Sequence, residues 1–61
     1  MNYAEKIKKY REIKFLTQQE LADLLNVSLA TVNRWETSKF EPTIKIKKKL
    51  HDLFVEVGIE K

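Results

Sequence analysis

Apolar residues recur along this chain at intervals of three and four, the spacing that gathers side chains on one face of an α-helix. Four such segments follow one another, separated by short polar stretches. The first extends from about Tyr3 to Lys14, with an apolar stripe formed by Tyr3, Ala4, Ile7, Tyr10 and Ile13. The pattern therefore predicts an all-α fold.

The second and third segments are short and begin at strong helix caps. Thr17 precedes QQELADLL, and Glu20, three residues after it, completes a capping box. Asn26 tolerates the left-handed conformation in which a helix ends, so the second helix is expected to stop just before it. Ser28 then caps a third helix that runs to about Glu36. Two helices separated by so few residues must meet in a tight turn.

The fourth segment predicts a longer helix, which follows Pro42 and the candidate cap Thr43 and can end at Gly58. Its apolar residues at helical spacing are Ile46, Leu50, Leu53, Phe54 and Val57. The buried side of the second helix is expected to hold Leu21, Ala22, Leu24 and Leu25. The predicted core of the whole domain consists of Ile7, Leu21, Leu25, Val32, Trp35, Leu50 and Phe54.

Length and composition limit the fold further. The chain has 61 residues, which we expect to form one domain over 1–61, and a single Gly and a single Pro favour helices joined by tight turns. It has no Cys, which excludes disulfides and thiolate metal sites. A net charge of +3 permits a polyanionic partner. We see neither a membrane span nor a signal peptide, and therefore expect a cytoplasmic protein with no membrane partner.

The order LTQQELA, LNVS, TVNRWE and EPT resembles the helix-turn-helix of the Cro/C1-type repressor family, with the motif over 18–37. With its flanking helices the resemblance covers about Tyr3 to Phe54. It implies a compact, lambda-repressor-like domain of four to five helices. It also implies a small transcriptional regulator, most simply a repressor, that binds double-stranded DNA and reads the major groove with helix 28–36.

In the resembled family, the exposed positions of the second motif helix face the bases. Arg34 can donate two hydrogen bonds to guanine, and Asn33 can pair with adenine. Leu29 and Ala30 offer apolar contact that suits a thymine methyl group. We rank Arg34 first, Asn33 second, and Ala30 and Leu29 third; the alternative is a solvated helix face.

Contacts to the DNA backbone are expected at the start of the motif, around the third helix and in the loop after it. By the resemblance, Gln18 touches a phosphate and braces the third helix. For Lys39 the alternative is a solvated loop lysine. The candidates for phosphate contact are Gln18, Ser28, Thr31, Thr37, Ser38 and Lys39.

The resemblance also implies a structural ion pair between Arg11 and Glu36, which would tie the first helix to the end of the third. Two departures concern turns: Phe15 and Ser38 stand where the family commonly has Gly. Phe15 leaves open whether the first turn differs or is strained. Because Ser38 replaces a Gly in the loop after the third helix, the family's geometry for that loop is a weaker guide to this chain.

Family members often dimerise through the C-terminal segment, which implies a homodimer on a palindromic operator. Val55 and Ile59 are spaced to share a helix face and form the candidate dimer surface; the alternative is a C-terminus that folds back on its own core. Two other functions remain open: a protein-interaction or antitoxin-like module, and the DNA-targeting domain of a longer protein. The chain has one His, His51, and no nucleophile paired with a base, so we expect no catalysis, no metal, no cofactor and no small-molecule substrate.

Overall fold

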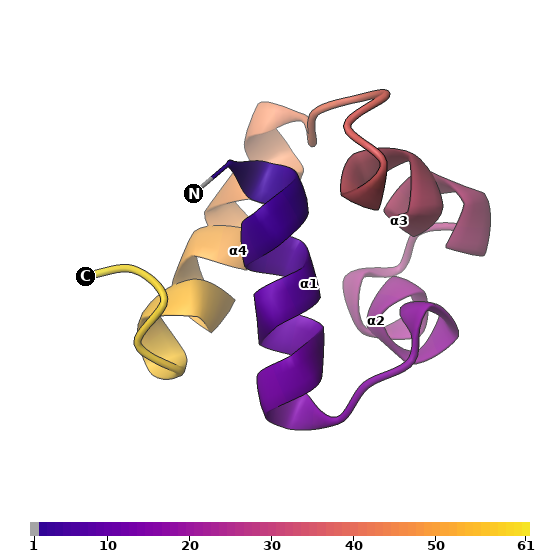
Figure 1. Ribbon diagram of the computed structural model, residues 1–61. Coiled ribbons are helices and arrows are strands. Elements are labelled where there is room, and N and C mark those ends of the chain that lie inside the picture. Colours follow the sequence, from indigo (N-terminus) through magenta and orange to yellow (C-terminus); the bar gives the residue numbers. More distant parts are fainter. Residues whose placement is uncertain (1) are drawn as a thin grey trace.

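The computed structural model describes residues 2–61; residue 1, part of the expected domain, lies outside this range. Four helices follow in order: α1 (Tyr3–Lys14), α2 (Gln18–Leu25), α3 (Leu29–Glu36) and α4 (Ile44–Glu56). Figure 1 shows α1 running between α4 on one side and the α2–α3 pair on the other. The predicted all-α fold is confirmed. None of the helices within residues 2–61 is long and apolar enough to cross a membrane.

The first three helices begin at side-chain caps. Asn2, Thr17 and Ser28 each accept the backbone N–H three residues ahead at 2.9–3.1 Å. The carboxylate of Glu20 accepts the N–H of Thr17 at 2.9 Å, which completes the predicted capping box. Thr43 stands at the expected position before α4, but its side chain makes no capping hydrogen bond. The starts of α2 and α3, which fix the motif, are thus set by local sequence.

Each helix is followed by a residue in the left-handed conformation. These residues are Phe15, Asn26, Ser38 and Gly58, with φ of 56°, 57°, 61° and 82°. Each donates its N–H to the carbonyl three residues back at 3.1–3.3 Å, and the next residue donates to the carbonyl five residues back at 2.8–2.9 Å. This pair of bonds defines a Schellman motif. Phe15 and Ser38 therefore keep the left-handed turn that Gly adopts most easily.

The residue after each left-handed position is turned back toward the helix. Leu16, Val27 and Ile59 occupy this place after α1, α2 and α4, and all three pack against the core. Such an apolar contact commonly accompanies the Schellman motif. After α3 the corresponding residue is Lys39, which is exposed. The turn after α3 is therefore the one that lacks an apolar anchor.

Residues from all four helices form the core. All seven residues of the predicted core are buried, together with Ala4, Tyr10 and Ala22. The ring of Tyr10 meets that of Phe54 edge-on, with 6.2 Å between centroids. This packing joins α1 to α4 and leaves α2 and α3 on the opposite side.

Two residues expected on buried faces are exposed: Ile13 by 40% and Leu24 by 55%. An α-helix advances about 100° per residue, so steps of three fall about 60° short of a full turn. By this drift Ile13 lies about 120° around the helix from Ile7. Leu24 is displaced in the same way from the face shared by Leu21, Ala22 and Leu25. Both expectations were wrong because a row at spacing three leaves the face it starts on.

Replacing Phe15 by Gly should raise the free energy of unfolding by about 0.5–1 kcal/mol. A left-handed backbone costs an L-residue about 1–2 kcal/mol, and Gly offsets part of this gain through its greater freedom in the unfolded chain. The ring of Phe15 is 92% exposed, so its removal loses little burial. Thermal unfolding should show a midpoint several degrees higher.

The matched control is Phe15→Ala, which removes the same ring but keeps the Cβ atom. It should leave the midpoint close to that of the unmodified protein. Equal midpoints for the Gly and Ala variants would show that the left-handed backbone at this position carries no cost.

Candidate nucleic-acid interface

The inner face of α3 is fixed by apolar packing against α2 and α1. Val32 and Trp35 are buried on this face, and Ala22 of α2 is completely buried beside it. A small side chain at position 22 lets the two helices approach closely. The outer face of α3 is left open to solvent.

The four candidates for base contact lie on this outer face. Leu29, Ala30, Asn33 and Arg34 are all exposed. None of the ion pairs among residues 2–61 includes Arg34. The one acidic residue of α3, Glu36, is 4% exposed and turns inward. The outer face of α3 therefore exposes the guanidinium of Arg34 and the amide of Asn33, and no carboxylate of α3 lies on it.

Most of the candidates for phosphate contact are engaged in internal hydrogen bonds. The hydroxyls of Ser28 and Thr31 lie 2.8 Å apart and bond to each other. Thr37 Oγ1 donates to the backbone carbonyl of Asn33 at 2.9 Å. The amide of Gln18 donates to Glu36 at 3.1 Å. Each of these side chains therefore already has a hydrogen-bond partner within the fold.

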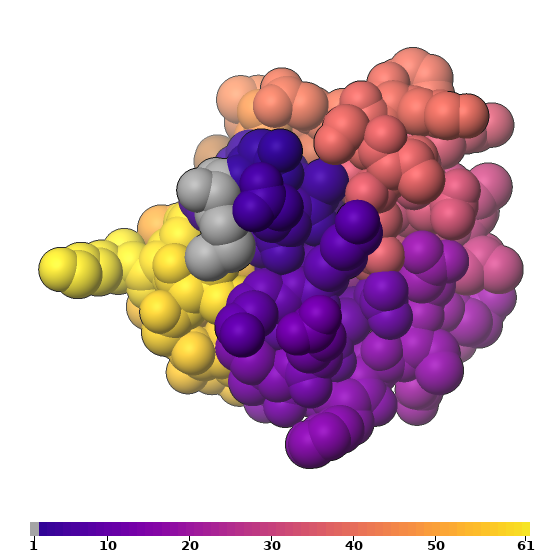
Figure 2. Space-filling model, in the orientation of Figure 1, coloured from indigo at the N-terminus to yellow at the C-terminus, as the bar shows by residue number. Residues whose placement is uncertain are grey.

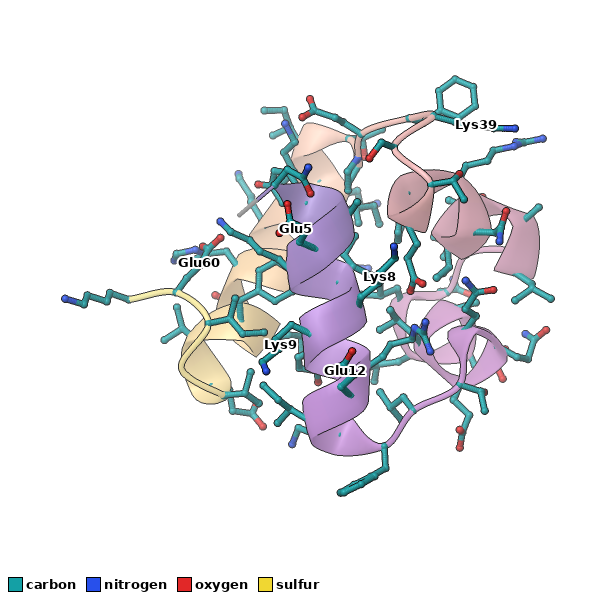
Figure 3. The ribbon with its side chains drawn as sticks, in the orientation of Figure 1. Glu5, Lys8, Lys9, Glu12, Lys39 and Glu60 are labelled. Carbon is teal, nitrogen blue, oxygen red and sulfur yellow. The ribbon has the colours of Figure 1, made fainter. Side chains whose placement is uncertain are left out.

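Ser38 and Lys39 are the remaining candidates, and both are exposed in the loop after α3. This loop stands out from the surface beside α3 at the upper right of Figure 2. Lys39 lies at its outer edge, on the side of the molecule away from Glu60 (Figure 3). The structure thus places one exposed ammonium group next to the exposed face of α3.

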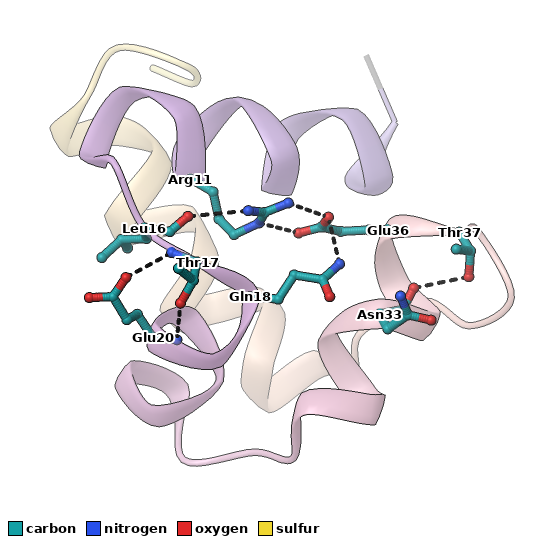
Figure 4. A network of polar contacts seen from close by, with 8 residues as sticks. All are labelled: Arg11, Leu16, Thr17, Gln18, Glu20, Asn33, Glu36 and Thr37. Carbon is teal, nitrogen blue, oxygen red and sulfur yellow. Dashed lines mark hydrogen bonds and ion pairs between the residues drawn. The ribbon is translucent and has the colours of Figure 1, made fainter.

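A polar network joins the three helices behind this face (Figure 4). Arg11 of α1 donates to both carboxylate oxygens of Glu36, from Nε at 2.6 Å and from Nη2 at 2.7 Å. Its remaining nitrogen, Nη1, donates to the carbonyl of Leu16 at 3.2 Å. Gln18 of α2 supplies the third hydrogen bond to the carboxylate. The structure thus brings together Arg11, Glu36 and Gln18, three residues named from the sequence.

The charge of Glu36 is maintained despite its burial. Burial acts to raise its pKa, but hydrogen bonds from Arg11 and Gln18 and the positive charges of Arg11 and Lys8 outweigh it. The pKa of Glu36 therefore lies below its ordinary value. The hydrogen bond to Glu36 is the main cause that raises the pKa of Arg11. The pair remains ionised at neutral pH and holds α3 against α1.

One residue beside the outer face was not singled out by the apolar pattern or by the resemblance. Phe40 is 61% exposed in the loop after α3, and its ring centroid lies 5.6 Å from Cζ of Arg34. The only sequence signal is a large aromatic residue within a polar stretch. Its position depends on the turn at Ser38, which a helical pattern does not describe.

The candidate dimer residues do not share a helix face. α4 ends at Glu56, so Ile59 lies beyond it and packs against the core, while Val55 stays 42% exposed. The tail is tied back because Glu60 accepts a hydrogen bond from Lys6 and pairs with His51. The expected shared face was wrong because helical spacing stops where the helix stops.

Comparison with known proteins gave two matches. Residues 7–54 match the family model described as Helix-turn-helix. Over 49 residues the chain is 39% identical to an uncharacterized HTH-type transcriptional regulator of Methanocaldococcus jannaschii. That alignment covers 80% of this chain and 74% of the relative. No solved structure matches the chain.

Replacing Arg11 by Met should lower the free energy of unfolding by roughly 3 kcal/mol near pH 7. This is the lower end of the range for breaking a buried ion pair, because Arg11 itself is partly exposed. Glu36 would be left buried with only Gln18 as a partner. Urea unfolding followed over a pH series measures the effect.

The loss should depend on pH with a definite sign. The stability that Glu36 contributes is complete above the ordinary carboxylate pKa and is lost as pH falls through its lowered pKa. The two proteins should therefore converge in stability in acid. As a control, Lys14→Met removes an exposed ion pair to Glu56 and should cost less than about 1 kcal/mol. A difference between Arg11→Met and the unmodified protein that is constant with pH would contradict this account of Glu36.

Proposed function

This chain belongs to the Cro/C1-type helix-turn-helix family of DNA-binding transcriptional regulators, and from that premise we propose that it is a repressor that reads a palindromic operator. In this proposal residues 1–61 act as one DNA-binding domain, and α3 enters the major groove of double-stranded DNA. The observation that carries it is the outer face of α3, where Asn33 and Arg34 are exposed while Glu36 turns inward.

Arg34 is the principal base reader in this proposal. A guanidinium donates two hydrogen bonds to O6 and N7 of guanine, and this is the commonest specific contact in the major groove. Asn33 pairs with adenine, and Ala30 and Leu29 contact thymine methyl groups. Because Arg34 has no carboxylate partner among residues 2–61, its donors need not be released from an ion pair before they reach a base.

Backbone contacts come from the edges of the same surface. Lys39 is exposed beside α3 and supplies charge to a phosphate. Ser38, Ser28, Thr31 and Thr37 lie around the same helix and contribute hydroxyl groups. Gln18 stands at the start of α2, where exposed backbone amides also favour an anion. Its main role is to hold Glu36, and through it the orientation of α3.

The operator is palindromic in this proposal because two copies of the chain bind side by side. Recognition helices of a dimer address half-sites about one helical turn apart. Val55 is the exposed apolar residue near the end of α4 that we assign to the interface, whereas Ile59 supports the tail from inside. The interface thus lies on α4, away from the outer face of α3.

The test of base reading uses duplexes selected from random DNA by the unmodified protein. Arg34→Ala should weaken binding to the selected duplex by about 10- to 100-fold and relax the preference at one base pair. Lys39→Ala should instead weaken the selected and scrambled duplexes alike and reduce the salt slope by about one unit. Titrations over a salt series distinguish the two. Equal losses on both duplexes for Arg34→Ala would make Arg34 a phosphate contact, and no binding by the unmodified protein at low salt would refute the function.

The dimer is tested separately with Val55→Glu. A carboxylate at an apolar interface should convert the dimer to a monomer and weaken operator binding while the helical content stays unchanged. Lys45→Gln, at an exposed position on the same helix, lowers the net charge by the same one unit and is the control. Sedimentation that shows a monomer for the unmodified protein, both alone and on the selected duplex, would remove the dimer from the proposal.

A further inference from the structure

The guanidinium of Arg34 lies over an aromatic ring that no other part of the proposal uses. Its Cζ atom is 5.6 Å from the centroid of the Phe40 ring. This distance is within the range of a cation–π contact, about 6 Å. Both side chains are exposed, Phe40 by 61%, so the contact belongs to the surface and not to the core.

The fold holds Phe40 in this place through the backbone of Arg34 itself. The carbonyl of Arg34 accepts the N–H groups of Lys39 at 2.9 Å and Phe40 at 3.4 Å. It also accepts the hydroxyl of Thr37 at 3.3 Å. The left-handed backbone of Ser38 is what turns the chain back to that carbonyl. The loop is therefore anchored on the residue whose side chain its ring meets.

A cation–π contact needs no hydrogen-bond acceptor from the protein. The ring attracts the positive charge of the Arg34 guanidinium, and no carboxylate among residues 2–61 pairs with its N–H donors. A carboxylate partner would occupy those donors, as Glu36 does for Arg11. The ring thus restricts the rotamers of Arg34 without supplying an acceptor that would compete with a base for its N–H donors. Restricting a flexible side chain before binding reduces the entropy lost on binding.

We propose that Phe40 is a positioning residue that holds the Arg34 guanidinium for base recognition and thereby raises specificity at that base pair. The inference rests on the proposed function, in which α3 reads the major groove. It assigns a role to the loop after α3 that is distinct from the phosphate contact of Lys39. Phe40 acts through Arg34 and not through a contact of its own with the bases.

The experiment compares Phe40→Leu, Phe40→Trp and the unmodified protein on two duplexes, one selected and one altered at the base pair that Arg34 reads. Phe40→Leu keeps an apolar side chain and removes the π face. It should lower the ratio of the two affinities by about 2- to 5-fold, which corresponds to about 0.5–1 kcal/mol at 1.4 kcal/mol per tenfold. Phe40→Trp should keep or raise the ratio, because Trp is the strongest cation–π partner.

Two controls separate this role from others. Phe15→Leu removes another exposed ring, at the end of α1 opposite to the loop (Figure 1), and should leave the ratio unchanged. Phe40→Leu added to Arg34→Ala should have no further effect on either duplex. In the free protein, the side-chain protons of Arg34 should show an upfield ring-current shift by NMR that Phe40→Leu abolishes.

Several outcomes would overturn the inference. An unchanged ratio for Phe40→Leu would make the ring a bystander, and the absence of the ring-current shift would show that the contact does not form in solution. If Phe40→Leu weakens both duplexes equally, with or without Arg34, the ring contacts DNA directly. Failure of the unmodified protein to bind either duplex would refute the proposed function, and this result is distinguishable because it appears before any variant is compared.

Discussion

The buried carboxylate of Glu36 is the constraint on which the arrangement of the first three helices depends. Moving a charge out of water is costly, and the cost is offset only when geometry and hydrogen bonding are good. Here Arg11 and Gln18 supply three hydrogen bonds to its two oxygens. Because the donors come from α1 and α2, the carboxylate is satisfied only when both helices stand in one arrangement around α3. The network therefore contributes orientation more than net stability.

That orientation also determines what α3 shows to solvent. Residues two apart on an α-helix lie about 200° apart around its axis. When Glu36 faces the core, Arg34 necessarily faces outward, as the structure shows. The buried position of Glu36 and the exposed position of Arg34 are thus coupled by helical geometry alone. Because the contact with Arg11 holds Glu36 in the core, the negative charge of Glu36 is absent from the outer face of α3. The positive charge of Arg34 is exposed on that face.

The sequence predicts the local features of this fold because short-range chemistry sets them. The caps at Thr17 and Ser28, the turn at Asn26 and the buried core all follow from residue type and spacing. The pairing of Arg11 with Glu36 came from family resemblance, since 25 residues separate the two and no periodicity links them. Phe40 was missed because its place depends on a left-handed turn at Ser38 that residue type does not favour.

The internal hydrogen bonds around α3 limit how strongly a single copy can hold DNA. A hydroxyl or amide that must give up an internal partner to reach a phosphate gains little, because an ordinary hydrogen bond is worth only about 1 kcal/mol net. Gln18, Thr31 and Thr37 are in this position. In the proposed complex, the affinity that grows with the number of neutralised phosphates would then come from few groups, chiefly Lys39. The proposed pair of chains on adjacent half-sites would raise the affinity without any new type of contact, because the second binding event becomes intramolecular. If α3 reads the major groove as proposed, the internal hydrogen bonds that orient it also give a physical reason why a palindromic site bound by two chains would suit this domain.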